Sequence, residues 1–116
     1  YLNKNGCKIA IASSNSRKLI QAVLESHGIA SYFEAIVTSC DVKAGKPAPD
    51  VYLEAAKLLN LNPCDCVVFE DIPAGIMAGK AAGMTVFAVE DEFSEPLREK
   101  KLALAEGWVR DYTDFI

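Results

Sequence analysis

The chain has 116 residues and a formal net charge of −4, with 51% hydrophobic and 24% charged residues. This length and composition are typical of one ordinary globular domain. The negative charge, with no run of Lys or Arg to offset it, argues against a nucleic-acid-binding surface. The longest apolar runs have the length of strands, which is far too short to cross a membrane. We therefore expect one globular domain over residues 1–116.

Short apolar runs alternate with segments of helical periodicity along this domain. The runs predict strands at residues 8–12, 35–38, 66–69 and 84–89. The periodic segments predict helices ending near Ser26, from Pro49 to Leu59, from Pro73 to Ala82, and from Glu95 to Ala105. Trp108–Val109 could add a short edge strand, and 90–92 reads as a solvated loop. The alternating order predicts an α/β fold, a three-layer, Rossmann-like parallel sheet with helices on both faces.

Local signals support these boundaries. Gly28 is the expected end of the first helix, where His27 would suit the helix dipole and is not expected to be catalytic. Gly75 and Gly79 should let the third helix approach the sheet closely. The apolar stripe expected for the second helix is Val51, Tyr52, Ala55, Leu58 and Leu59.

The cysteines predict a reducing environment. The four of them are Cys7, Cys40, Cys64 and Cys66. The last two are one residue apart, which is the wrong spacing for a C-x2-C zinc or redox motif. We therefore expect four reduced thiols in a cytoplasmic protein.

Polar chemistry follows the first predicted strand. Ser13, Ser14 and Asn15 stand where a helix begins, and hydroxyls with free backbone N–H groups form an anion site that suits phosphate. Plain N-capping of the helix explains Ser14 or Asn15 equally well.

A lysine lies in a stiff loop after the second predicted strand. The segment Gly45-Lys46-Pro47-Ala48-Pro49-Asp50 places Lys46 beside two prolines, which restrict the backbone and can hold its charge at one place. The two prolines also make a cis bond between Lys46 and Pro47 more frequent here than at an average X-Pro position. A surface lysine before a proline-initiated helix is the alternative.

An acid pair, Glu70-Asp71, ends the third predicted strand. Ligands of open parallel sheets bind beyond the carboxyl ends of the strands, and Mg²⁺ prefers carboxylate and water oxygens. Alternatively, Asp71 only supports the start of the helix near Pro73, and Glu70 is solvated. An anion site, a fixed cation and metal-binding acids together indicate phosphoryl chemistry, which depends on positioning and charge neutralisation.

The motifs resemble those of the haloacid dehalogenase (HAD-like) superfamily, and within it the β-phosphoglucomutase-like phosphatases and phosphomutases. Residues 8–13 resemble an apolar strand ending in Ser or Thr, residues 45–50 a lysine before Pro-x-Pro-Asp, and residues 68–83 the acidic motif. The resemblance implies that Ser13 and Lys46 act in catalysis. It also implies that Ser13, Ser14, Asn15 and Lys46 bind the phosphoryl group. Glu70 and Asp71 would then bind Mg²⁺.

One family motif is missing from the chain. Members carry Asp-x-Asp, whose first Asp is the nucleophile and whose second is the general acid/base, and this sequence has no Asp-x-Asp. In the family that motif lies on the central first strand, and a cap domain is inserted after it. We therefore expect the chain to be the C-terminal part of a HAD-like catalytic core, without the central strand or the cap. Alone it should be inactive.

The resemblance leaves three functions open. The first is a Mg²⁺-dependent phosphatase of small phosphorylated metabolites such as sugar phosphates, acting through an aspartyl-phosphate whose Asp lies outside this chain. The second is a β-phosphoglucomutase-like phosphomutase, and the third is an inactive binding or assembly module. A receiver-type signalling domain fits poorly, because it has its acids on the first strand and its lysine on the last. Without the central strand, two inner strand edges should either close against each other or accept a strand from a dimer or swapped partner.

Overall fold

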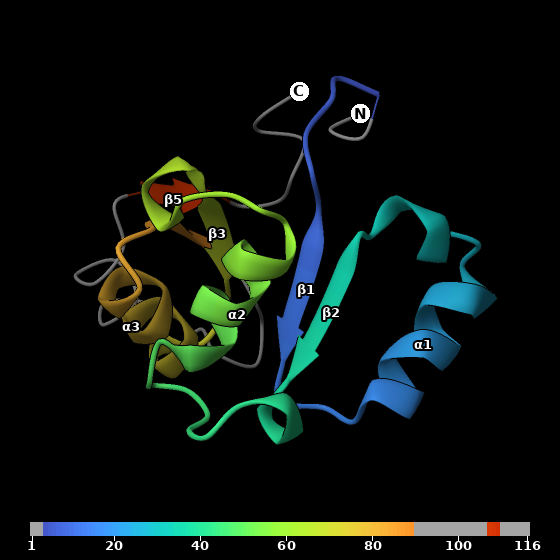
Figure 1. The fold of residues 1–116 in the computed structure, drawn as a ribbon, viewed down its shortest axis with the longest axis horizontal. Coiled ribbons are helices and arrows are strands. Elements are labelled where there is room, and N and C mark those ends of the chain that lie inside the picture. The colour runs from blue at the N-terminus through green and yellow to red at the C-terminus, as the bar shows by residue number, and fades with distance from the viewer. Residues whose placement is uncertain (1–3, 90–106, 110–116) are drawn as a thin grey trace.

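The computed structural model describes residues 4–89 and 107–109 (Figure 1). Its elements in chain order are β1 (Ala10–Ser13), α1 (Arg17–Ser26), η1 (Ala30–Tyr32), β2 (Ala35–Thr38), η2 (Ser39–Asp41), α2 (Asp50–Leu58), η3 (Pro63–Asp65), β3 (Val67–Glu70), α3 (Pro73–Ala81), β4 (Thr85–Val89) and β5 (Gly107–Val109). The α/β order predicted from the sequence is confirmed, including the short strand at 107–109. The helix expected at 95–105 and the loop at 90–92 lie outside the described residues.

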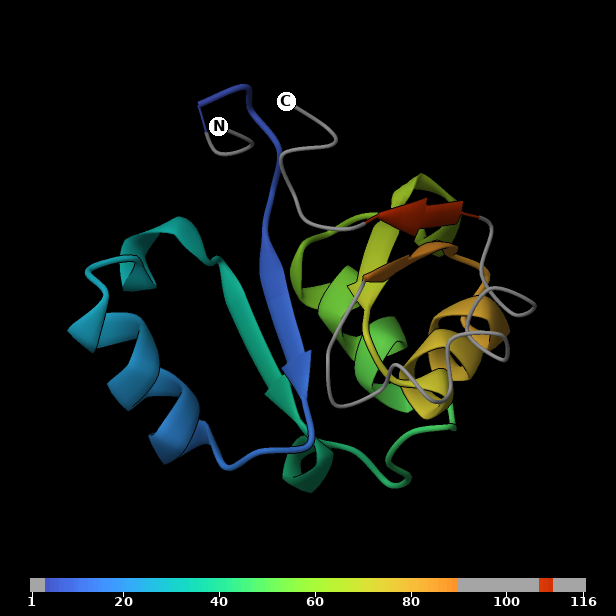
Figure 2. The ribbon, with the colours of Figure 1, turned by 180° about the vertical axis from the view of Figure 1, so that it is seen from behind.

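The described strands form two parallel sheets (Figures 1 and 2). One sheet pairs β1 with β2, with Ala10 opposite Ala35 and Ser13 opposite Thr38. The other has the order β3-β4-β5, with Val67 opposite Thr85. Among the described residues β1 pairs only with β2, and β3 only with β4. The alternative in which β1 and β3 close against each other is therefore wrong.

Helix α2 connects the two sheets. It packs against β1 and β2 on one side and contacts α3, which in turn packs on β3 and β4. Helices α1 and α2 lie on opposite sides of the β1–β2 pair (Figure 1), so this part of the fold has the layered arrangement expected of an α/β domain.

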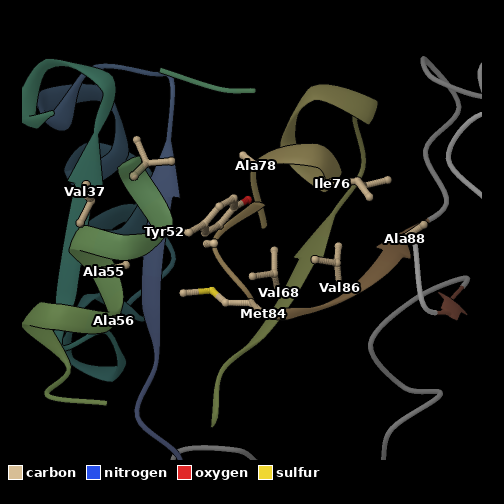
Figure 3. Close-up of a cluster of buried hydrophobic side chains, with 12 residues drawn as sticks. Val37, Tyr52, Ala55, Ala56, Val68, Ile76, Ala78, Met84, Val86 and Ala88 are labelled. Atoms are coloured by element: carbon tan, nitrogen blue, oxygen red, sulfur yellow. The ribbon is translucent and has the colours of Figure 1, made fainter. Parts of the chain in front are cut away.

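One hydrophobic cluster joins the elements around α2 and α3. Figure 3 shows Val37 of β2 beside α2, and Tyr52 of α2 pointing toward the side chains of β3, β4 and α3. Its members are Val37, Val51, Tyr52, Ala55, Ala56, Val68, Ile76, Ala78, Ala82, Met84, Val86 and Ala88. Because these strands and helices are short, burial in this common cluster stabilises them more than their own backbone preferences do.

Both ends of α1 are capped, but the N-cap comes after Ser14 and Asn15, the two residues that the capping alternative named. Ser16 is the N-cap of α1, and its hydroxyl accepts from the backbone N–H of Leu19 at 3.2 Å. His27 is the C-cap of that helix, and Gly28 adopts a φ of +66°, as its predicted position requires. The prediction for the apolar stripe of α2 is wrong for one residue, because Leu58 is 54% exposed.

The four cysteine thiols are free in the structure. In the described part of the chain, none of the helices has the length and hydrophobicity needed to span a bilayer.

Candidate functional site

Lys46 brings together the ends of strands from both sheets. The peptide bond that follows it is cis, the form that the flanking prolines made more frequent at this position. Its ammonium group donates to the backbone carbonyl of Ala12, in β1, at 3.2 Å. It also donates to the carboxylate of Glu70, the last residue of β3, with Nζ 3.3 Å from Oε2 and 3.5 Å from Oε1. The side chains of this ion pair are only 13% and 12% exposed, so Lys46 is not a solvated surface lysine.

Tyr52, which lies on α2, contacts both members of the Lys46–Glu70 ion pair and forms with them a polar cluster. Its hydroxyl donates to Oε2 of Glu70 at 3.3 Å, and the Lys46 ammonium lies 5.2 Å from the centroid of its ring. The sequence placed Tyr52 only in the apolar stripe of α2. A hydroxyl on an otherwise apolar stripe was the available signal, since a buried Tyr usually finds a polar partner.

Gly75 makes room for the Glu70 side chain. A Cβ atom at this position in α3 would overlap the Glu70 carboxylate. Gly79, one turn further on, faces the strands, where a Cβ atom would lie 2.7 Å from Val86. The prediction that the glycines allow close packing is therefore confirmed for Gly79, whereas Gly75 accommodates a charged side chain of the site.

Burial shapes the electrostatics of the cluster. Desolvation raises the pKa of Glu70 above its usual range, and the nearby negative charge of Asp71 adds to this, although the Lys46 charge opposes it. Desolvation also raises the pKa of Tyr52, helped by the Glu70 charge. Tyr52 therefore keeps its proton at physiological pH and acts as a hydrogen-bond donor.

The serine loop lies at the carboxyl end of β1. Ser13 directly follows Ala12, whose carbonyl Lys46 contacts. The Ser13 hydroxyl accepts from the backbone N–H of Asn15 at 3.0 Å, so it already stabilises the turn. Ser14 and Asn15 are exposed and lie between β1 and α1.

Asp71 is the second carboxylate at the end of β3. It is partly buried, and among the described residues we find no hydrogen-bond or ion-pair partner for it. Adjacent oxygen donors on Glu70 and Asp71 fit the chemistry of Mg²⁺, which retains several waters and takes one or two carboxylates from the protein. In the described segments no third His, Cys, Asp or Glu joins them.

Two other acids near the strand ends have structural partners. Asp41 accepts from the backbone N–H and the hydroxyl of Thr38 and from Arg17, at 2.8, 3.1 and 2.7 Å. Asp50 begins α2, as expected, and accepts from the backbone N–H of Ala44 at 3.3 Å. An open groove of about 580 Å³ lies beside these acids, between η2 and the outer face of α2.

The fold and the site define an α/β protein with a lysine, two carboxylates and a serine loop at the carboxyl ends of parallel strands. The family model of the haloacid dehalogenase-like hydrolases matches residues 1–83. The chain belongs to this family.

Named relatives and solved structures agree with the family. The chain is 48% identical over 90 residues to a bifunctional riboflavin kinase/FMN phosphatase of Arabidopsis thaliana, covering 77% of this chain and 24% of the relative. It is 45% identical over 105 residues to hexitol phosphatase A of Escherichia coli, covering 90% and 48%. The crystal structure of β-phosphoglucomutase from Clostridium difficile matches with a TM-score of 0.81 and 30% identity, covering 99% and 48%. The chain thus spans half or less of each of these proteins.

Proposed function

We propose that this chain forms half of the active site of a Mg²⁺-dependent phosphatase that acts on small phosphorylated metabolites, sugar phosphates among them. The position of Lys46 carries the proposal. Its ammonium group joins the end of β1, next to the serine loop, to the Glu70–Asp71 pair at the end of β3. A phosphoryl group held between these strand ends would meet a positive charge and hydroxyl and N–H donors, which are what its transfer requires.

The residues of this chain would have separate tasks. Ser13 and the N–H of Ser14 would bind the phosphoryl oxygens, and the N–H of Asn15 would join them on exchanging its bond to the Ser13 hydroxyl for one to phosphate. Lys46 would neutralise the charge of these oxygens. Glu70 and Asp71 would hold Mg²⁺, which offsets negative charge on a phosphoryl group. We propose that the nucleophile is an aspartate outside this chain, because the sequence contains no Asp-x-Asp.

The relatives support this substrate class. Two of them are named hexitol phosphatase A and fructose-1-phosphate phosphatase, and the chain is 45% and 41% identical to them over the matched residues. A phosphomutase is the second candidate, favoured by the similarity to the β-phosphoglucomutase structure. It would use the same residues of this chain.

A strand between β1 and β3 would complete the site. Both strands end with residues of the proposed site, and each pairs on one side only in the described part of the chain. We propose that a parallel strand from a second chain or from a swapped partner fills this position. An inactive assembly module is the remaining alternative, because the same edges could bind a strand without any chemistry.

Phosphate binding tests the proposed half-site directly. Inorganic phosphate should shift the backbone amide NMR signals of Ser14 and Asn15, and Lys46→Ala should weaken this binding. Lys43→Ala is the matched control, because Lys43 is an exposed lysine of the same loop. Phosphate that binds equally well to both variants, or that shifts other amides, would contradict the assignment of Lys46.

A further inference from the structure

Hydrophobic packing at position 52 requires an aromatic ring but no hydroxyl group. The Tyr52 side chain is only 7% exposed and its ring belongs to the hydrophobic cluster. Phe would fill nearly the same volume. In Figure 3 the ring projects from α2 toward the β3 and α3 side of the cluster, with its oxygen at the far end. There the hydroxyl donates to Glu70.

Three side chains form a closed set of contacts. Tyr52 and Lys46 both donate to the same oxygen, Oε2 of Glu70, at 3.3 Å. The ring face of Tyr52 also lies against the Lys46 ammonium, which a ring attracts electrostatically. The three residues come from the loop before α2, from α2 and from β3. Of these three residues, only Tyr52 belongs to the hydrophobic cluster.

We propose that Tyr52 is a positioning residue, which fixes the Glu70 carboxylate and the Lys46 ammonium relative to each other. Its ring contacts the Lys46 ammonium on one side, and its hydroxyl donates to Oε2 of Glu70. Oε1, whose contact with Lys46 is longer at 3.5 Å, is then the oxygen left for a cation. This last step rests on the proposed function, whereas the positioning of the ion pair does not.

Exchange of lysine ammonium protons with water tests the positioning in the chain itself. In ¹H–¹⁵N spectra the Lys46 ammonium should exchange slowly, because it is hydrogen-bonded and mostly buried. Tyr52→Phe keeps the ring and removes the hydroxyl, and it should accelerate this exchange roughly two- to tenfold, the effect of losing one hydrogen bond of ordinary net strength. Lys8 is an internal reference, because its ammonium donates to the Leu59 carbonyl at 2.8 Å, away from Tyr52.

A matched variant separates positioning from general destabilisation. Tyr32→Phe removes a hydroxyl from a residue that is 45% exposed, on η1, and it should leave the exchange of Lys46 and Lys8 unchanged. An unchanged ratio of Lys46 to Lys8 exchange in Tyr52→Phe would overturn the proposal. So would equal acceleration of both lysines, which would show loosening of the whole fold.

Addition of Mg²⁺ to the same samples tests the cation step. The shift of the Asp71 amide should occur at several-fold higher Mg²⁺ in Tyr52→Phe than in Tyr32→Phe. Equal Mg²⁺ affinities in Tyr52→Phe and Tyr32→Phe would overturn the claim that Tyr52 affects cation binding. If Mg²⁺ does not shift Asp71 even in the unmodified chain, the proposed function fails, and the exchange result still decides the role of Tyr52.

Discussion

At the scale of single residues, Asp71 offers the clearest test of the metal site. Glu70 is already bound by Lys46 and Tyr52, so most of the affinity of this chain for Mg²⁺ should come from Asp71. We predict weak binding, with a dissociation constant of about 1 mM or more, because two carboxylates leave much of the octahedral shell to water. Asp71→Ala should abolish the binding measured by calorimetry. The control is Asp65→Ala, an exposed acid on η3, and retained binding in Asp71→Ala would refute the assignment.

Asp41 should make stability depend on pH. The backbone N–H of Thr38 lowers the pKa of Asp41, and the Thr38 hydroxyl and Arg17 lower it further. A carboxylate whose pKa is lower in the folded state stabilises the fold above its unfolded pKa of about 3.9, and this stabilisation is lost as the pH falls through the folded pKa. In urea unfolding, Asp41→Asn should therefore have a lower free energy of unfolding than the unmodified chain at pH 7, and this difference should be smaller at pH 3. An equal difference at the two pH values would contradict the assigned role of Asp41.

At the scale of elements, the two glycines of α3 should respond differently to substitution. Gly79→Ala pushes a methyl group against the buried side chain of Val86. It should lower the free energy of unfolding by about 1–3 kcal/mol through overpacking, with the Lys46–Glu70 pair intact. Gly75→Ala should instead displace the Glu70 carboxylate and break that pair. Thermal unfolding and Mg²⁺ binding, measured on both variants, distinguish the two effects; the reverse pattern would show that the packing is misassigned.

The individual elements were largely predictable from local signals. Apolar runs, helical periodicity and Gly28 place each described strand and α-helix within about two residues of its predicted bounds, because these signals act locally. The three 3-10 helices η1, η2 and η3 were not predicted. The exposed Leu58 was wrongly assigned to the core. Small residues of α2, such as the buried Ala56, face the sheet there, and helical periodicity alone does not show which side of a wide apolar stripe is covered.

The candidate site was predictable only in part. Lys46 and Glu70 were singled out from sequence, and the structure brings them together. The contact of Tyr52 with Glu70 was not foreseen, because it depends on how α2 lies between the two sheets, which is set by tertiary packing rather than by local sequence. The room that Gly75 provides for Glu70 has the same origin.

At the scale of the whole molecule, the edges of β1 and β3 should govern association. Backbone N–H and C=O groups of an unpaired edge favour pairing with another strand. We predict that the chain forms dimers or larger species, seen by light scattering, and that an added strand-forming partner reduces this association. A monomer over the full concentration range, with amides of β1 and β3 that exchange freely with water, would support an isolated half-domain and contradict the pairing.

Placing this chain in a complete protein shows directly whether it forms half of an active site. In the test chimera, the chain replaces the segment of hexitol phosphatase A that it matches, and so regains the remainder of that protein. We predict that the chain alone does not hydrolyse a phosphomonoester with Mg²⁺ and that the chimera does. In the chimera, Lys46→Ala should lower kcat/KM roughly 10- to 150-fold, the effect of losing one charge-assisted hydrogen bond in the transition state. Turnover by the chain alone, or a folded chimera with unchanged kcat/KM after Lys46→Ala, would contradict the proposed function.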